Sequence, residues 1–183
     1  LVTLMYLASS SFLKVISFVN GRKWLKDNKL IVLIIFLFLL ANILFLSVYT
    51  DVWWDSSVYI GMGKYIFSLG KSGLWEESRP LILPSILGAG WKLNLNVVYF
   101  GRAISLIFAV LVVFVIYKLS SKLFSRKIGL LAAFFTAFSY TFIFFSSNIL
   151  TEIPSALFVL LAVYYFFDNR FFLMGMLSGI AVM

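Results

Sequence analysis

The stretch L-I-V-L-I-I-F-L-F-L-L-A-N-I-L-F-L-S-V-Y, residues 30–49, decides the fold class of this chain. It contains no charged residue from end to end. An α-helix rises about 1.5 Å per residue, so roughly twenty residues cross the hydrocarbon layer of a bilayer, which is about 30 Å thick. The stretch therefore predicts a membrane-spanning helix.

The whole chain has the composition of a membrane protein. Of its 183 residues, 63% are hydrophobic and 12% are charged, and the mean hydropathy is +1.06. A soluble domain has roughly 45–50% apolar and about 25% charged residues. This excess of apolar residues predicts an all-α fold, a polytopic bundle of transmembrane helices.

The net charge and the missing residue types narrow the chemistry. The charge of +8 arises from Lys and Arg clusters beside apolar runs, as in topology signals and lipid-headgroup contacts, which argues against a nucleic-acid partner. The chain contains no Cys and no His, which excludes disulfides, thiolate metal sites and imidazole catalysis. Acid–base chemistry must then come from Asp, Glu, Tyr or Lys.

The basic clusters predict the topology. Four basic residues precede the first span and place its N-terminal side in the cytoplasm: Arg22, Lys23, Lys26 and Lys29. Residues 1–29 are expected to form a cytoplasmic or interfacial segment, and residues 30–183 the N-terminal part of the transmembrane domain of a longer protein. The expected spans are about 30–49, 104–119, 128–145, 154–167 and 171–183, with an outer loop over residues 51–101.

The loop between the first two spans concentrates the polar chemistry. The stretch 51–84 holds four of the seven acidic residues and three of the five tryptophans. Apolar residues recur there at helical spacing up to Gly70, a plausible C-terminal stop: Val58, Met62, Tyr65, Ile66 and Leu69. We expect an interfacial helix with its apolar face toward lipid.

Several residues of this side are candidates for function, each with a structural alternative. Asp55 is a general base or a helix N-cap. Arg79, before Pro80, contacts a phosphate or marks a loop-to-helix junction. Glu152, near the start of the fourth span, faces a water-filled cavity or a solvated turn. Other residues would ordinarily be exposed loop charges or snorkelling cations: Glu76, Glu77, Lys64, Lys92 and Arg102.

The order of three motifs resembles the C-type membrane glycosyltransferases (GT-C) that use polyprenyl-phosphate sugars, in particular the protein O-mannosyltransferases and the aminoarabinose transferases of lipid A. The motifs are W-W-D-S-S-V-Y at 53–59, R-P-L-I-L-P at 79–84 and S-S-N-I-L-T-E-I-P at 146–154. The resemblance covers roughly residues 30–183. It implies that Asp55 deprotonates an acceptor hydroxyl, that Arg79 holds the donor phosphate and that Glu152 lines the same cavity. The family's acidic pair is Asp-Glu, whereas Ser56 follows Asp55 here, so Glu152 or Glu76 would replace the second carboxylate.

The expected function is transfer of a hexose or pentose from a polyprenyl- or dolichyl-phosphate donor to a protein, glycan or lipid acceptor, at the extracytoplasmic face of the cell membrane. The expected catalytic residues are Asp55 and Glu152, and the expected substrate-binding residues are Arg79, Tyr59, Glu76, Glu77 and Arg102. No metal is assigned, although Asp51 and Asp55 could together bind a divalent cation. The alternatives are a transporter or lipid flippase and a non-catalytic scaffold. The transferase requires Asp55 and Arg79 to face one shared pocket.

Overall fold

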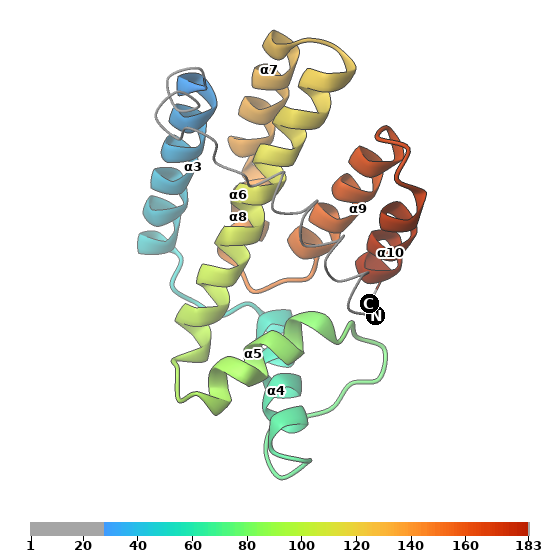
Figure 1. Cartoon of the computed structure of the whole chain (residues 1–183). Helices are drawn as coiled ribbons and strands as arrows, with labels where there is room; N and C mark the ends of the chain where they lie inside the picture. The colour runs from blue at the N-terminus through green and yellow to red at the C-terminus, as the bar shows by residue number, and fades with distance from the viewer. Residues whose placement is uncertain (1–27, 183) are drawn as a thin grey trace.

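The computed structural model describes residues 28–182, and this part of the chain contains eight α-helices and no strand. The expectations for residues 1–19 and for three of the four basic residues before the first span lie outside the described residues. The helices are α3 (Lys29–Val48), α4 (Trp54–Phe67), α5 (Ile82–Lys92), α6 (Val97–Leu123), α7 (Arg126–Ala137), α8 (Tyr140–Ser147), α9 (Glu152–Phe166) and α10 (Phe171–Val182). Figure 1 shows α3, α6, α7, α9 and α10 as an elongated bundle, with α4 and α5 at one end. The prediction of a helical membrane protein is confirmed.

Two of the described helices, α3 and α6, are long and apolar enough to cross a membrane. They correspond to the expected spans at 30–49 and 104–119, but α6 has 27 residues and begins earlier than expected. The reason is Asn96, whose side-chain oxygen accepts hydrogen bonds from the backbone N–H groups of Val98 and Tyr99 and so caps the helix there. At about 40 Å, α6 is longer than the hydrocarbon layer is thick.

The stretch 128–145, expected as one span, is divided between α7 and α8, whose axes are bent by 63°. Ser139 lies at the break and accepts a hydrogen bond from the backbone N–H of Phe142 at 3.2 Å. A serine in this position caps the start of a new helix. Whether the bent pair crosses the bilayer as one span or turns back within it stays a prediction.

The last two expected spans, 154–167 and 171–183, correspond to α9 and α10, which have 15 and 12 residues. Both are shorter than the roughly 20 residues that cross a bilayer without help. They pack against each other around Ala162, Tyr165 and Leu177. Figure 1 shows them side by side, and α9 also contacts α6.

The acidic residues are unequally divided between the two ends of the bundle. At the end away from α4, which we call the basic end, lie Lys29, Lys122 and Arg126. There the Tyr117 hydroxyl donates to Asn28 at 2.9 Å and Lys122 forms an ion pair with Asp168. Five of the six acids in the described residues belong to the other end, the acidic end: Asp51, Asp55, Glu76, Glu77 and Glu152.

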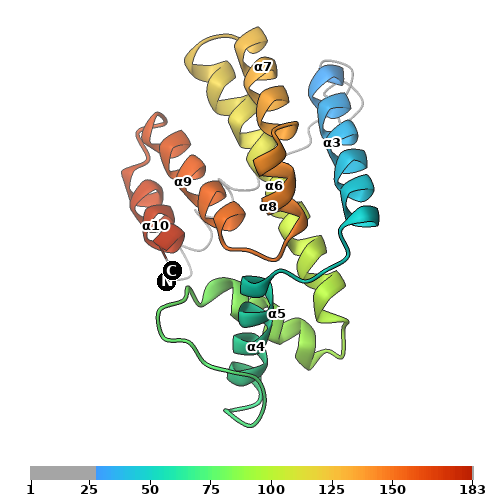
Figure 2. The same ribbon diagram turned by 180° about the vertical axis from the view of Figure 1, so that it is seen from behind.

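The acidic end is built on a close contact between α4 and α5, which lie together below the bundle in both views (Figures 1 and 2). A Cβ added to Gly63 would lie 2.6 Å from the carbonyl oxygen of Pro84, so only glycine allows this approach. The expectation that the apolar face of α4 lies toward lipid is wrong for Val58 and Met62, which are buried inside the protein. The helix ends before Gly70 (φ +81°), as the sequence predicts.

One polar cluster lies inside the bundle, between α3 and α8. The side-chain oxygen of Asn42 accepts hydrogen bonds from the Ser146 hydroxyl at 2.7 Å and from the Ser147 hydroxyl at 2.9 Å. All three residues are buried, and Asn42 Nδ2 donates to the carbonyl oxygen of Phe38. Polar contacts of this kind hold helices together where water is absent. They fix α8 and the turn that follows it.

Candidate active site

Arg79 is the centre of a polar cluster at the acidic end. It lies in the loop between α4 and α5 and donates three hydrogen bonds, each from a different nitrogen. Nη2 donates to Asp55 Oδ1 at 2.7 Å, Nε donates to Glu76 Oε1 at 3.0 Å, and Nη1 donates to the Tyr59 hydroxyl at 3.3 Å. Asp55 and Arg79 are therefore in direct contact, as expected, whereas a pocket shared by both side chains stays a prediction.

The start of α4 brings Asp55 and Tyr59 onto one face. The helix begins at Trp54, and residues four apart in a helix lie one above the other, so both side chains reach the same guanidinium. The alternative that Asp55 is the N-cap is wrong: the N-cap residue is Trp53, and Asp55 lies in the first turn. A carboxylate in the first turn is favoured there by the helix dipole.

The cluster is negative overall, because two carboxylates surround one guanidinium. The hydrogen bonds that Arg79 donates to Tyr59, Glu76 and Asp55, in that order of effect, raise the pKa of Arg79 above its ordinary value. The Arg79 side chain is 26% exposed and that of Asp55 is 32% exposed, so both remain accessible to a ligand. The cluster therefore combines a guanidinium that keeps its charge with two carboxylates, at the protein surface.

The cluster is connected to the start of α9. The Tyr59 hydroxyl lies 3.1 Å from Oγ1 of Thr151, which is the residue directly before α9. Tyr59 itself is only 4% exposed. The guanidinium carbon of Arg79 lies 5.4 Å from the centre of the Tyr59 ring, within the range of a cation–π contact. Residues from α4, from the following loop and from the α8–α9 turn therefore meet at Arg79.

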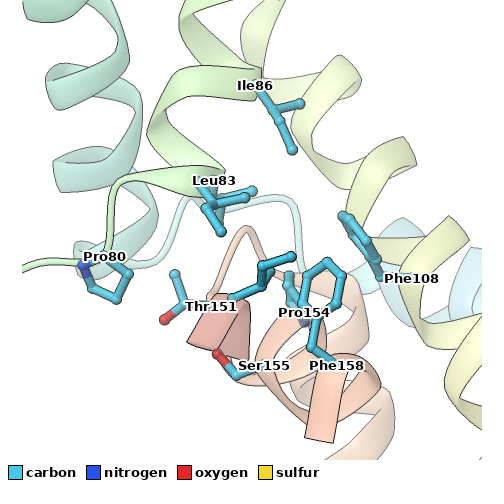
Figure 3. Close-up of a pocket in the computed structure, with 10 residues that line it drawn as sticks. Pro80, Leu83, Ile86, Phe108, Thr151, Pro154, Ser155 and Phe158 are labelled. Carbon is cyan, nitrogen blue, oxygen red and sulfur yellow. The ribbon is translucent and has the colours of Figure 1, made fainter. Parts of the chain in front are cut away.

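Two hollows adjoin this cluster. The first is a narrow, mostly apolar groove between α5, α6, α9 and α10, and Figure 3 shows Thr151 between Pro80 and Pro154 in its wall. The second is an open hollow of about 610 Å³ lined by Glu77, Arg79 and Ser85 among others. The two share Pro80, Ile82 and Ile86, so the apolar groove continues from the hollow that contains the Arg79 side chain.

The sequence model of the family described as dolichyl-phosphate-mannose-protein mannosyltransferase matches residues 78–183, which is more than half of the chain. The chain belongs to this family. Neither curated proteins nor solved structures gave a match.

As a member of the mannosyltransferase family, the chain is a membrane glycosyltransferase of the mannosyltransferase type. The match begins one residue before Arg79 and includes Thr151 and Glu152. Asp55, Tyr59 and Glu76 lie N-terminal to it, and the structure alone brings them to Arg79.

Three of the site residues expected from the sequence lie outside the Arg79 cluster: Glu152, Glu77 and Arg102. Glu152 is exposed at the first position of α9, next to Thr151. Glu77 is exposed in the open hollow. Arg102 instead donates from Nη2 to the backbone oxygens of Thr50 and Asp51, at 2.9 Å each, and thereby fastens the chain as it leaves α3.

No group of three or more Asp, Glu, His or Cys side chains arranged to hold a metal occurs within residues 28–182. Asp55 contacts a guanidinium, and a divalent cation between Asp51 and Asp55 stays an untested expectation. Sequence reasoning missed the part of Thr151 in the cluster. The only sequence signal for Thr151 was its position directly before Glu152, between the third and fourth expected spans.

Proposed function

We propose that this glycosyltransferase moves a sugar from a polyprenyl-phosphate donor of the dolichyl type to a hydroxyl group of a protein acceptor, at the outer face of the membrane. The observation that carries the proposal is the 2.7 Å contact between Asp55 and Arg79 beside the two hollows. Transfer from a lipid phosphate needs an anion-binding cation and a base within one site.

Arg79 is proposed to hold the donor phosphate. A guanidinium has five N–H donors, three of which are engaged with Asp55, Glu76 and Tyr59, so two more N–H groups can bind phosphate oxygens. The apolar lining that begins at Pro80 supports this role, because the lipid part of a donor whose phosphate binds Arg79 would meet apolar side chains there. The charged phosphate would then lie against a cation, and the lipid chain against apolar side chains.

Asp55 is proposed to be the general base. It accepts the proton of the acceptor hydroxyl while the acceptor oxygen forms a bond to the anomeric carbon of the sugar. The bond from that carbon to the phosphate oxygen breaks, and the polyprenyl phosphate leaves with the additional negative charge, which Arg79 stabilises. One carboxylate on the acceptor side and a stabilised leaving group are what an inverting transfer requires.

The other expected site residues have secondary roles in this proposal. Glu76 holds the guanidinium through Nε and so orients it. Glu152 is the second carboxylate, at the start of α9 beside Thr151, and would face the bound sugar. Glu77 and Arg102 are proposed only for contacts at the edge of the substrate, because neither reaches the Arg79 cluster.

The basic cluster at the connection between α6 and α7 supports placing the site on the outer face. Basic residues gather at the end where α6 meets α7, and positively charged loops remain in the cytoplasm. The Arg79 cluster belongs to the opposite end (Figure 2). A glycosylation assay on sealed vesicles of known orientation tests this assignment, since the donor must be accessible from the face that carries α4.

The central test is Asp55→Asn, assayed for sugar transfer from polyprenyl-phosphate mannose in membranes. We expect transfer to be abolished while the protein still inserts and Arg79 keeps a hydrogen-bonding partner. Transfer at the wild-type rate would remove the assignment of the base. Transport of the lipid donor across proteoliposomes without any sugar transfer would instead support the transporter or flippase alternative.

A further inference from the structure

The Thr151 hydroxyl is the far end of a hydrogen-bonded chain that begins at Arg79 and passes through Tyr59. We propose that Thr151 is a positioning residue, which fixes the phosphate-binding guanidinium through the Tyr59 hydroxyl. The inference rests on the proposed role of Arg79 and extends it to the turn between α8 and α9.

The Tyr59 hydroxyl has two hydrogen-bonding partners. A guanidinium only donates, so the Tyr59 oxygen accepts from Arg79 Nη1 at 3.3 Å. The same oxygen lies 3.1 Å from Thr151 Oγ1, and either hydroxyl can be the donor of that hydrogen bond. Without an oxygen at position 151, the Tyr59 hydroxyl would lose the second partner that fixes its orientation.

Burial makes this dependence strict. Tyr59 is 4% exposed and belongs to a buried apolar cluster with Leu83, Leu87 and Ile149, so water has little access to replace a lost partner. The loss of one of its two partners is costly for a buried hydroxyl, and the structure shifts to regain it. Because Tyr59 contacts Arg79 through both its oxygen and its ring, any such shift reaches the guanidinium.

The usual structural role of a threonine before a helix does not account for Thr151. Such a residue commonly caps the helix by accepting a hydrogen bond from its first N–H groups. Thr151 makes no such side-chain bond to α9. Its oxygen is directed to Tyr59 instead, and the residue lies in the wall of the apolar groove (Figure 3).

The test is steady-state kinetics of the full-length enzyme in nanodiscs, with Thr151→Val and Thr151→Ser. We expect Thr151→Val to raise the KM for polyprenyl-phosphate mannose by about 3- to 10-fold, the worth of one hydrogen bond, and to leave the acceptor KM unchanged. Thr151→Ser keeps the oxygen and should restore the donor KM. A merely structural role would lower the unfolding temperature without this selective change.

A double-mutant cycle with Tyr59→Phe makes the test specific, because Tyr59→Phe removes the connection itself. The double variant should have the same donor KM as Tyr59→Phe alone, whereas independent effects would multiply. Thr136→Val, the same substitution in α7 far from Arg79, is the matched control and should leave both KM values unchanged.

Two results overturn the inference: a wild-type donor KM in Thr151→Val, or full multiplication of the two effects in the double variant. Thr151→Ala is measured in parallel, so that poor folding of one variant leaves the other to decide. An inactive wild-type enzyme would instead contradict the proposed function, which is a separate outcome.

Discussion

The guanidinium of Arg79 and the carboxylate of Asp55 are in contact at 2.7 Å, although 24 residues separate them in the chain. The turn after α4 makes this contact, and the tight packing of α4 on α5 holds it in place. A phosphate that binds the two remaining N–H groups of Arg79 would therefore lie close to the Asp55 carboxylate. Such an arrangement brings the donor phosphate and the proposed base together at one guanidinium.

Replacing Arg79 by Lys should reduce kcat/KM for the donor by at least about tenfold. An ammonium keeps the charge but not the planar fork, so it cannot bind Asp55, Glu76, Tyr59 and a phosphate together. Steady-state kinetics with polyprenyl-phosphate mannose measures the change, and insertion into the membrane should be normal. Wild-type kinetics in this variant would show that Arg79 does not bind the donor.

The wild type and Arg79→Lys should also differ in the pH dependence of donor binding. Hydrogen bonds to Tyr59, Glu76 and Asp55 raise the pKa of Arg79 further above an ordinary value that is already strongly alkaline. The stabilising effect of its charge is present below that pKa and is lost only as the pH rises through it, outside any practical assay. Lysine ordinarily loses its charge near pH 10.4.

The ratio of the donor KM in Arg79→Lys to that of the wild type should therefore increase as the pH passes about 10. Using the ratio cancels the titration of groups that both proteins share. A ratio that stays constant from about pH 8 to pH 11 would mean that the charge at position 79 does not contribute to donor binding.

The sequence predicted those features that depend on local pattern. An uncharged run of twenty residues leaves no alternative to α3, and Gly70 marked the end of α4 because few other residues adopt its backbone conformation. The prediction that Asp55 and Arg79 belong to one site came from the order of the motifs. The spacing of the two residues along the chain does not fix the distance between them.

What the sequence did not predict depends on contacts between distant segments. The break between α7 and α8 depends on Ser139, which caps the start of α8. Because Ser139 lies inside an apolar run, the sequence pattern favours one continuous helix instead. Arg102 was expected at the substrate, but the free carbonyl groups beyond α3 are its partners. The contact of Thr151 with Tyr59 joins residues 92 positions apart and has no local signature.

Replacing Gly63 by Ala should destabilise the fold by about 1–3 kcal/mol, the cost of overpacking a close contact. The new methyl group would lie 2.6 Å from the carbonyl oxygen of Pro84 and 2.8 Å from the backbone nitrogen of Gly88, so α4 and α5 must separate. Thermal unfolding in detergent measures the loss. Activity should fall as well, because α4 carries Asp55.

Gly175→Ala provides the matched control for this substitution. A Cβ at Gly175 would meet nothing within 4 Å, and alanine is favoured over glycine in a helix by about 1 kcal/mol. We expect this variant to be as stable as the wild type or more so. Equal unfolding temperatures for the Gly63 and Gly175 variants would contradict the close contact between α4 and α5.

Replacing Asn42 by Leu should destabilise the bundle by about 1–2 kcal/mol, because the buried hydroxyls of Ser146 and Ser147 lose their common acceptor. Ser147 should carry more of the loss, since the Ser146 hydroxyl also donates to the carbonyl oxygen of Ile143 at 3.0 Å. The neighbouring change Ile43→Ala, on a side chain that is 60% exposed, should have little effect.

Adding Ser146→Ala and Ser147→Ala to Asn42→Leu should restore most of the lost stability, because removing both partners of a buried hydrogen bond is close to neutral, whereas removing one is not. The free energy of unfolding of the single, double and triple variants measures this difference. The kcat of the triple variant then separates two roles of the cluster. A recovered fold with a reduced kcat would mean that the hydrogen bonds to Asn42 also position α8 and the turn leading to Thr151, whereas full recovery of both would limit them to packing.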